Sequence, residues 1–103
     1  MQPDAAITEY ARKLRALLGV NLKELVLFGS RARGDYRESS DYDCLIILSR
    51  KSGESSEIID NIGVEFLDKY NIFVVPIICT VDEWAVEGRL PLGKVIAHEG
   101  INI

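Results

Sequence analysis

The chain has little of what a membrane-spanning or disulfide-rich protein needs. Its longest apolar run, residues 72–79, is interrupted by Pro76, whereas a transmembrane helix needs about 20 apolar residues. The two cysteines, Cys44 and Cys79, both lie in apolar runs, which favours buried thiols in a reducing compartment over a disulfide framework. Asp4 and Glu9 interrupt the first apolar stretch, so no secretory signal is predicted. We expect a cytoplasmic protein without a membrane partner.

Positive charge is also scarce. Twelve Lys and Arg face sixteen Asp and Glu, which gives a net charge of −4. Nucleic acid is therefore not expected as the main partner, because phosphate contacts need clustered basic residues. The chain has 103 residues, of which 48% are hydrophobic and 27% charged. This size and composition predict one ordinary globular domain over residues 1–103.

The spacing of apolar residues predicts an α/β fold with a small mixed sheet of three or four strands and flanking helices. Strands are expected at residues 22–28, 41–48 and 72–79, and helices at residues 4–18, 56–70, 80–87 and 91–98. Asp4 is a candidate N-cap for the first helix, and Thr80 with Glu83 forms a candidate capping box. Pro76 cannot donate to a strand ladder, so the third strand should be an edge strand or carry a bulge.

The polar segment between the first two strands opens with Gly29 and Ser30. Gly29 lacks a Cβ atom, so a phosphate could approach the backbone there. We expect Ser30 to cap a short helix over residues 31–33, whose start would attract anions. Because Gly29 ends a strand, a substitution there is expected to remove ligand binding and leave the fold nearly intact. Arg31 and Arg33 diverge on a helix, so at most one should reach a bound phosphate.

Asp41 and Asp43 open the second strand. Residues two apart on a strand face the same way, with Cα atoms about 6.5–7 Å apart. The two carboxylates should repel, so the pKa of one should rise unless a cation lies between them. One or two Mg²⁺ ions fit such oxygen ligands and would serve phosphoryl or nucleotidyl transfer. Gly-Ser or Asp-x-Asp alone is common in turns and at strand ends, and it is their combination that indicates a site.

The central segment, residues 28–47, resembles the signature of the minimal nucleotidyltransferase domain, a compact member of the DNA polymerase β-like superfamily. The matching positions are Gly-Ser-Arg-Ala-Arg-Gly at residues 29–34, Arg37, and Ser-Asp-Tyr-Asp at residues 40–43. The closing segment, residues 96–103 with Glu99-Gly100, is similar to the end of such domains. The resemblance implies the small palm fold of that superfamily.

The same resemblance implies Mg²⁺-dependent transfer of a nucleoside monophosphate from a nucleoside triphosphate, with ATP favoured, to an acceptor. Gly29 and Ser30 would cradle the phosphates, and Arg33 would contact a phosphate or act as a brace. Asp41 and Asp43 would be the catalytic, metal-binding pair. Many such domains are antitoxins of HEPN-domain toxins, some by adenylylating the toxin, so a HEPN protein is the implied partner. A homo-oligomer remains an open alternative.

One departure from the family pattern leaves two main hypotheses. The family has a third carboxylate on the strand after the second long helix, but residues 72–79 contain no acid, and Phe73 or a neighbour takes that position. The intact motifs favour a nucleotidyltransferase. The absent acid favours a non-catalytic nucleotide- or partner-binding module, such as an antitoxin-like pseudoenzyme. A third alternative is a homo-oligomeric structural domain with a decaying site.

Overall fold

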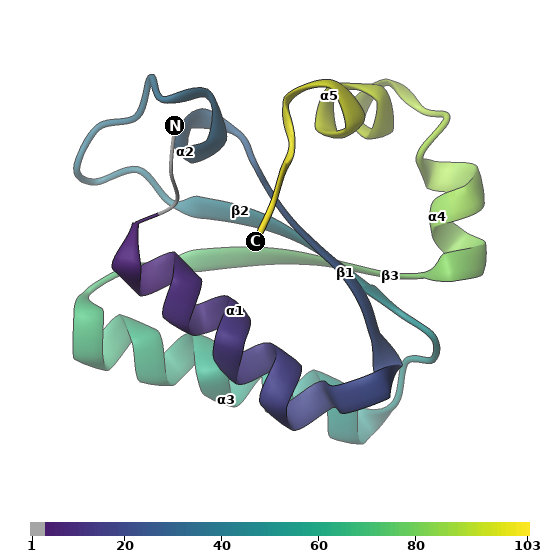
Figure 1. Ribbon diagram of the computed structural model, residues 1–103, viewed down its shortest axis with the longest axis horizontal. Coiled ribbons are helices and arrows are strands. Elements are labelled where there is room, and N and C mark those ends of the chain that lie inside the picture. Colours follow the sequence, from purple (N-terminus) through teal and green to yellow (C-terminus); the bar gives the residue numbers. More distant parts are fainter. Residues whose placement is uncertain (1–3) are drawn as a thin grey trace.

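The computed structural model describes residues 4–103 as a four-stranded sheet with helices on both faces (Figure 1). The elements are α1 (Ala5–Leu18), η1 (Gly19–Asn21), β1 (Leu22–Phe28), α2 (Ser30–Arg33), β2 (Tyr42–Leu48), α3 (Gly53–Tyr70), β3 (Val74–Thr80), α4 (Val81–Glu87), α5 (Pro91–Glu99) and β4 (Ile101–Asn102). The strand order is β3-β2-β1-β4. The β2–β3 pair is parallel and the other two pairs are antiparallel, which confirms the predicted mixed α/β sheet.

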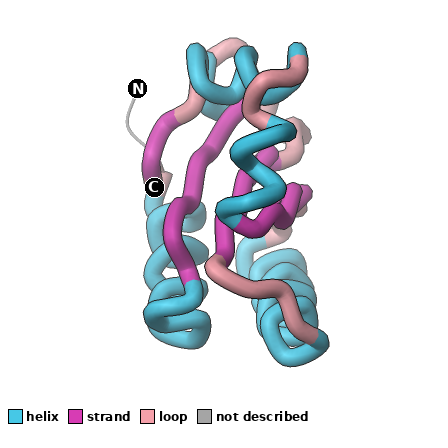
Figure 2. Tube along the Cα trace, turned by 90° about the vertical axis from the view of Figure 1, so that its right-hand side faces the viewer, coloured by secondary structure: helices cyan, strands magenta, loops and turns pink. Residues whose placement is uncertain are grey.

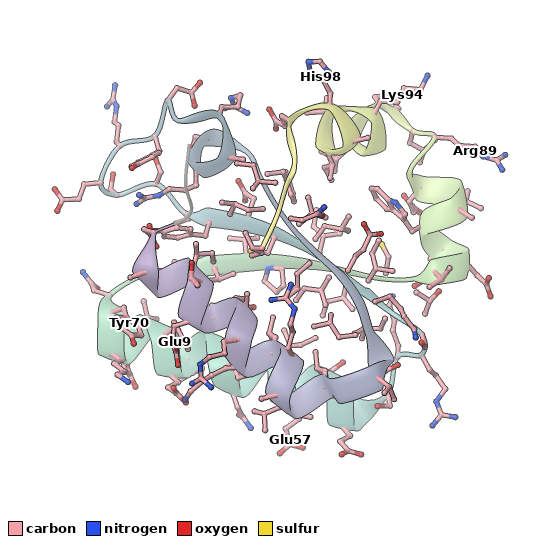
Figure 3. The ribbon with its side chains drawn as sticks, in the orientation of Figure 1. Glu9, Glu57, Tyr70, Arg89, Lys94 and His98 are labelled. Atoms are coloured by element: carbon pink, nitrogen blue, oxygen red, sulfur yellow. The ribbon has the colours of Figure 1, made fainter. Side chains whose placement is uncertain are left out.

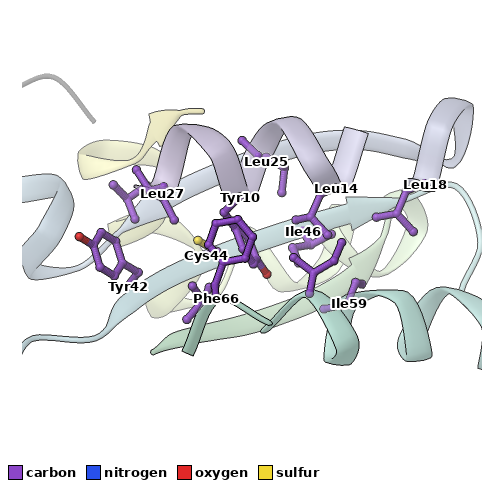
Figure 4. Close-up of a cluster of buried hydrophobic side chains, with 14 of the residues drawn as sticks. Tyr10, Leu14, Leu18, Leu25, Leu27, Tyr42, Cys44, Ile46, Ile59 and Phe66 are labelled. Carbon is purple, nitrogen blue, oxygen red and sulfur yellow. The ribbon is translucent and has the colours of Figure 1, made fainter. Parts of the chain in front are cut away.

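Helices α1 and α3 pack side by side on one face of the sheet, and α4 and α5 lie on the other (Figures 1 and 2). Successive residues of β2 alternate between the two faces. Cys44 and Ile46 join the buried cluster under α1 and α3 (Figure 4), whereas Leu45 and Ile47 join a smaller cluster that includes Ile96 of α5. All residues from Cys44 to Leu48 are buried, as expected for an apolar strand covered on both sides.

Helix starts follow their capping residues. The Ile7 amide donates to Asp4 Oδ1 at 3.0 Å, which confirms the predicted cap of α1. The Glu83 amide donates to Thr80 Oγ1 at 3.1 Å, and the Thr80 amide donates back to Glu83 Oε1 at 2.8 Å. The predicted capping box therefore opens α4.

The predicted start of α3 at residue 56 is wrong by three residues, since the helix begins at Gly53. The Ser55 amide donates to Ser52 Oγ at 3.1 Å, and the Ser52 amide donates to Ser55 Oγ at 2.9 Å. This reciprocal pair acts as a capping box built from two serines. A run of Ser and Gly that resembles a loop in sequence is therefore the first turn of a helix.

The last predicted strand is displaced by about two residues, because β3 starts at Val74 and extends to Thr80. It is an edge strand, so the prediction made from Pro76 is confirmed. Cys44 and Cys79 are buried and free of any disulfide, as expected. In the described part of the chain, no helix has both the length and the apolar character needed to cross a bilayer.

Candidate functional site

The turn between β1 and α2 requires glycine for its backbone conformation, and it also lies close to the Asp43 side chain. Gly29 has φ 78° and ψ −160°, a conformation that L side chains rarely adopt. A Cβ atom there would also lie 2.3 Å from Asp43 Oδ2, well inside van der Waals contact. The expectation that Gly29 can be replaced with little effect on the fold is therefore wrong. Gly29 brings the backbone turn and the Asp43 carboxylate into direct contact.

Ser30 opens α2 but does not cap it. The N-cap is Gly29, with no side-chain cap, and the Gly29 carbonyl accepts from the amides of Ala32 and Arg33, both at 3.0 Å. The predicted capping role of Ser30 is wrong because the backbone carbonyl of Gly29 already organises this single turn. Ser30 is half-exposed beside Gly29, and its contact with a phosphate stays a prediction.

Asp43 lies against Gly29 from the neighbouring strand, and Asp41 comes two residues before it. Antiparallel pairing sets Asp43 opposite Phe28, the residue before Gly29. Asp43 is half-buried, and Asp41 is exposed just before β2 begins. Burial raises the pKa of the Asp43 carboxyl above its usual value, and the charges of Asp41 and Glu99 raise it further, against an opposing effect of Arg33. The repulsion predicted between the two aspartates is therefore present.

These oxygen donors suit a hard divalent cation, because the added positive charge would relieve the electrostatic stress on Asp43. Within residues 4–103, however, no cluster of three or more Asp, Glu, His or Cys side chains has the arrangement of a metal site. The sole histidine, His98, projects outward from α5 (Figure 3). Asp41 and Asp43 therefore stay a predicted pair of metal ligands.

Arg33 extends toward the C-terminal segment of the chain. Its Nη1 atom donates to both oxygens of Glu99, at 3.0 and 3.2 Å, and its Nε donates to Asp35 at 3.2 Å. Glu99 Oε1 also accepts from the Gly29 amide at 3.1 Å. Sequence reasoning missed Glu99 as a site residue, and the only available signal was the Glu99-Gly100 pair at the end of the chain.

Arg31 points the other way and is buried, with 8% of its surface exposed. Its guanidinium lies 4.2 Å from the ring centre of Tyr36 and 4.4 Å from that of Tyr42. It donates to the carbonyls of Glu38 at 2.9 Å and Ser40 at 3.2 Å. Arg31 therefore fixes the loop that leads into Asp41, and only Arg33 remains near the Gly29 turn, in agreement with the predicted divergence.

Strand β3 provides no acid to this corner. Parallel pairing puts Val75 in register with Asp43, and partners in a parallel ladder project to the same face of the sheet. Phe73 precedes β3 and is 53% exposed. The β3 residue in register with Asp43 is thus Val75, two residues after the Phe73 named in the prediction.

A cavity of about 290 Å³ adjoins Asp41. It is lined by residues of the 31–42 segment and of the turn before β3, including Arg31, Ser40, Asp41, Tyr42, Asn71 and Phe73. A larger cavity of about 530 Å³ lies between the end of α1 and the start of α3, and none of the predicted site residues lines it. The larger cavity is therefore not the one that adjoins the predicted site residues.

Comparison with known proteins identifies the family to which this fold belongs. Residues 7–89 match the nucleotidyltransferase domain family, so the chain belongs to that family. A Methanocaldococcus jannaschii protein named as a candidate protein adenylyltransferase is 39% identical over 74 residues, covering 70% of this chain and 74% of that protein. A second, with the same description, is 30% identical over 89 residues, covering 84% of this chain and 60% of that protein.

A solved structure shares the fold. A chain in a crystal structure of a toxin–antitoxin with AMP-PNP superposes with a TM-score of 0.63 over 91% of this chain and 69% of that chain. The sequence identity is 14%, so the similarity concerns the fold alone.

Proposed function

We propose that this domain binds a magnesium–nucleoside triphosphate at the Gly29 turn and transfers the nucleoside monophosphate to an acceptor. The observation that carries the proposal is the contact between the Asp43 carboxylate and the Gly29 backbone, with Asp41 two residues earlier. Gly29 and Ser30 would face the phosphates, and Asp41 and Asp43 would hold Mg²⁺. ATP is the favoured donor, because the named relatives are candidate adenylyltransferases.

Bound Mg²⁺ would offset the negative charge of the triphosphate and make its phosphorus atoms more electrophilic. The protein's own residues have separate tasks. Asp43, packed against Gly29, fixes the metal side of the site relative to the backbone. Arg31 holds the loop before Asp41 through the Glu38 and Ser40 carbonyls. Both carboxylates are thereby kept in place before a ligand arrives.

In the proposed reaction an acceptor hydroxyl oxygen forms a bond to the α-phosphorus of the nucleotide. The bond from that phosphorus to the oxygen bridging to the β-phosphate breaks, and pyrophosphate leaves. The acceptor proton must pass to a base or to water. General-base assistance is typically worth about 10²–10⁴-fold in rate. Because Val75 occupies the register position of a third acid, we expect slow transfer.

The same observation at Val75 favours a second candidate function, a non-catalytic module that binds nucleotide or a partner protein. In this alternative Asp41 and Asp43 still hold Mg-ATP, and neutralisation of a partner depends on contact rather than on covalent modification. The two candidates differ only in whether α-phosphate reaches an acceptor. They therefore share one binding experiment and are separated by a transfer experiment.

The proposed acceptor is a protein, and a HEPN-domain toxin is the proposed partner class. Support comes from the resemblance of residues 28–47 to minimal nucleotidyltransferases and from the names of the two relatives. A chain of the toxin–antitoxin structure shares the fold of this domain. Transfer to a protein hydroxyl would block that residue by adding a nucleoside monophosphate to it.

Calorimetric titration of Mg-ATP tests the binding site. The wild type should bind one nucleotide, and Asp41→Asn/Asp43→Asn should bind at least about tenfold more weakly, a loss near 1.4 kcal/mol. The control is Asp60→Asn/Asp68→Asn, which removes the same charge from exposed positions of α3. Equal affinity in the wild type and the first variant would refute the assignment of the two carboxylates.

A transfer assay separates the two candidates. ATP labelled at the α-phosphate is added to the wild type with a co-expressed HEPN-domain partner. Slow labelling of the partner that is lost in Asp43→Asn would identify an enzyme. Tight Mg-ATP binding with no labelling would identify the non-catalytic module. Rapid labelling would contradict the proposed deficit and require another group to supply the missing ligand.

A further inference from the structure

Glu99 contacts two groups of the candidate site: the Gly29 amide, which the proposed function places against the phosphates, and the Arg33 guanidinium beside it. Its Oε1 atom accepts from the Gly29 amide at 3.1 Å and from Arg33 Nη1 at 3.2 Å, and its Oε2 accepts from Arg33 Nη1 at 3.0 Å. Its side chain is only 13% exposed. A carboxylate of the chain itself thus holds an anion position at the Gly29 turn.

The topology of the last strand puts Glu99 there. Strand β4 pairs with β1 through Leu27↔Ile101 and Val26↔Asn102, so the end of α5 is brought beside the end of β1. Figure 1 shows the C-terminal segment running between α2 and α5 toward the sheet. This pairing involves two residues of β4, and the Glu99 contacts to Gly29 and Arg33 join the segment to the site as well.

A carboxylate and a phosphate use the same donors. Both accept from backbone amides and from guanidinium groups, with hydrogen bonds strengthened by charge. They also repel each other, and Asp43 beside Glu99 already carries the electrostatic stress described above. A triphosphate at Gly29 and the Glu99 carboxylate in its present position would compete for one amide and one arginine.

We infer that Glu99 is an internal competitor of the nucleotide phosphates, so that binding at Gly29 and Arg33 requires the Glu99 side chain to leave. This inference rests on the proposed function and adds a residue that sets nucleotide affinity. A protein whose binding-competent state is a minor fraction shows an affinity reduced by that fraction. Removal of the competing charge should therefore tighten binding.

The test is Glu99→Gln, which keeps the shape of the side chain and an oxygen acceptor for the Gly29 amide but removes the charge. Calorimetry with Mg-ATP and with Mg-tripolyphosphate should show binding about three- to tenfold tighter than in the wild type. The gain should be similar for both ligands, because the competition concerns phosphates and not the base. Asp35→Asn is the matched control. It also removes a carboxylate that accepts from Arg33, at 3.2 Å, but Asp35 has no hydrogen bond to the Gly29 amide. This variant should bind Mg-ATP with the affinity of the wild type.

A merely structural brace would give the opposite result. If Glu99 positions Arg33 for the phosphates, Glu99→Gln weakens binding, and the inference is overturned. Equal affinity in wild type and Glu99→Gln also overturns it while the proposed function stands. Absence of Mg-ATP binding in both proteins refutes the proposed function and the inference together. Thermal melts of each variant verify folding. The variant Glu99→Asp has a shorter side chain with the same charge. It should bind Mg-ATP with an affinity between those of the wild type and Glu99→Gln.

Discussion

The two faces of the sheet differ in how completely they are covered. Among the described residues, the buried cluster between the sheet and helices α1 and α3 has sixteen residues, whereas the cluster on the side of α4 and α5 has five. Helix α4 buries none of its residues. Yet Asp43 lies on the second face, in line with Leu45 and Ile47 of β2. One strand therefore supplies the main core with one set of residues and the candidate site with the alternate set.

This division has a physical basis. Burial of apolar surface is the dominant favourable term in folding. The face under α1 and α3, here called the closed face, therefore carries most of the stability. A site for a charged ligand needs access to water and tolerates charges that repel one another. The less covered face toward α4 and α5, here called the open face, can hold Asp43, Asp41 and Glu99 together. The stability of the closed face offsets the free-energy cost of their mutual repulsion.

The largest expected effect breaks the closed face. Phe66 is fully buried and packs edge-to-face on Tyr10, with ring centres 5.5 Å apart. Phe66→Ala should cost about 3–5 kcal/mol of the free energy of unfolding. Trp84→Ala on the other face should cost less than about 2 kcal/mol, because Trp84 is half-buried at the edge of the smaller cluster. Urea unfolding compares them, and equal losses would contradict the unequal division of stability.

A smaller loss of stability is expected at Arg31, in the short helix α2 between β1 and β2. Arg31→Lys keeps the charge but cannot serve both the Glu38 and Ser40 carbonyls while it lies between two tyrosine rings. We expect a loss of about 1–3 kcal/mol in stability together with weaker Mg-ATP binding. Arg33→Lys, at a position where the side chain is 46% exposed, is the matched control and should change stability little. The reverse ranking would show that Arg31 does not organise the loop.

An acid added to the open face tests the strand register. Val75→Asp puts a carboxylate beside Asp43 on the same face, and it should raise the rate of nucleotide transfer within the range of general-base assistance, about 10²–10⁴-fold at most. Phe73→Asp lies outside β3 and should have no such effect. Transfer from α-labelled ATP measures both. An increase with Phe73→Asp alone would mean that the register of β3 does not govern the site.

The smallest expected effect is the loss of folding stability caused by the charged Asp43 carboxylate. Its pKa is raised in the fold, so the folded state binds the proton more tightly than the unfolded chain. The stability gained from protonation is present at low pH and is lost as pH rises through the raised pKa. Without metal or nucleotide, Asp43→Asn should therefore raise Tm near pH 7, and the gain should shrink as the pH falls toward about 4. A Tm difference that grows on acidification would have the wrong sign.

The sequence predicted those features that depend on local patterns. The bounds of β1, residues 22–28, agree with the structure because an apolar run ends at Gly29-Ser30. The Asp4 and Thr80 caps were predicted because each bonds within four residues. The start of α3 was missed because serines favour both loops and caps.

Features that depend on distant pairing could not be predicted. Glu99 reaches Gly29 only because β4 pairs with β1, a contact between residues 70 positions apart. Val75 was not distinguished from Phe73 because the register of a parallel pair is set across the β2–β3 crossover. Sequence alone therefore indicated the chemistry of the site but not its full set of residues.

The most direct measurement is the change in backbone amide chemical shifts when Mg-ATP is added to ¹⁵N-labelled protein. We expect the largest changes at residues 29–33 and 41–44, with a further change at Glu99 as its contacts to Gly29 and Arg33 are replaced. Amides around Phe66 under the closed face should move little. Changes centred instead on the larger cavity between α1 and α3, near Asn21 and Ser55, would contradict the assignment of the nucleotide site to the open face.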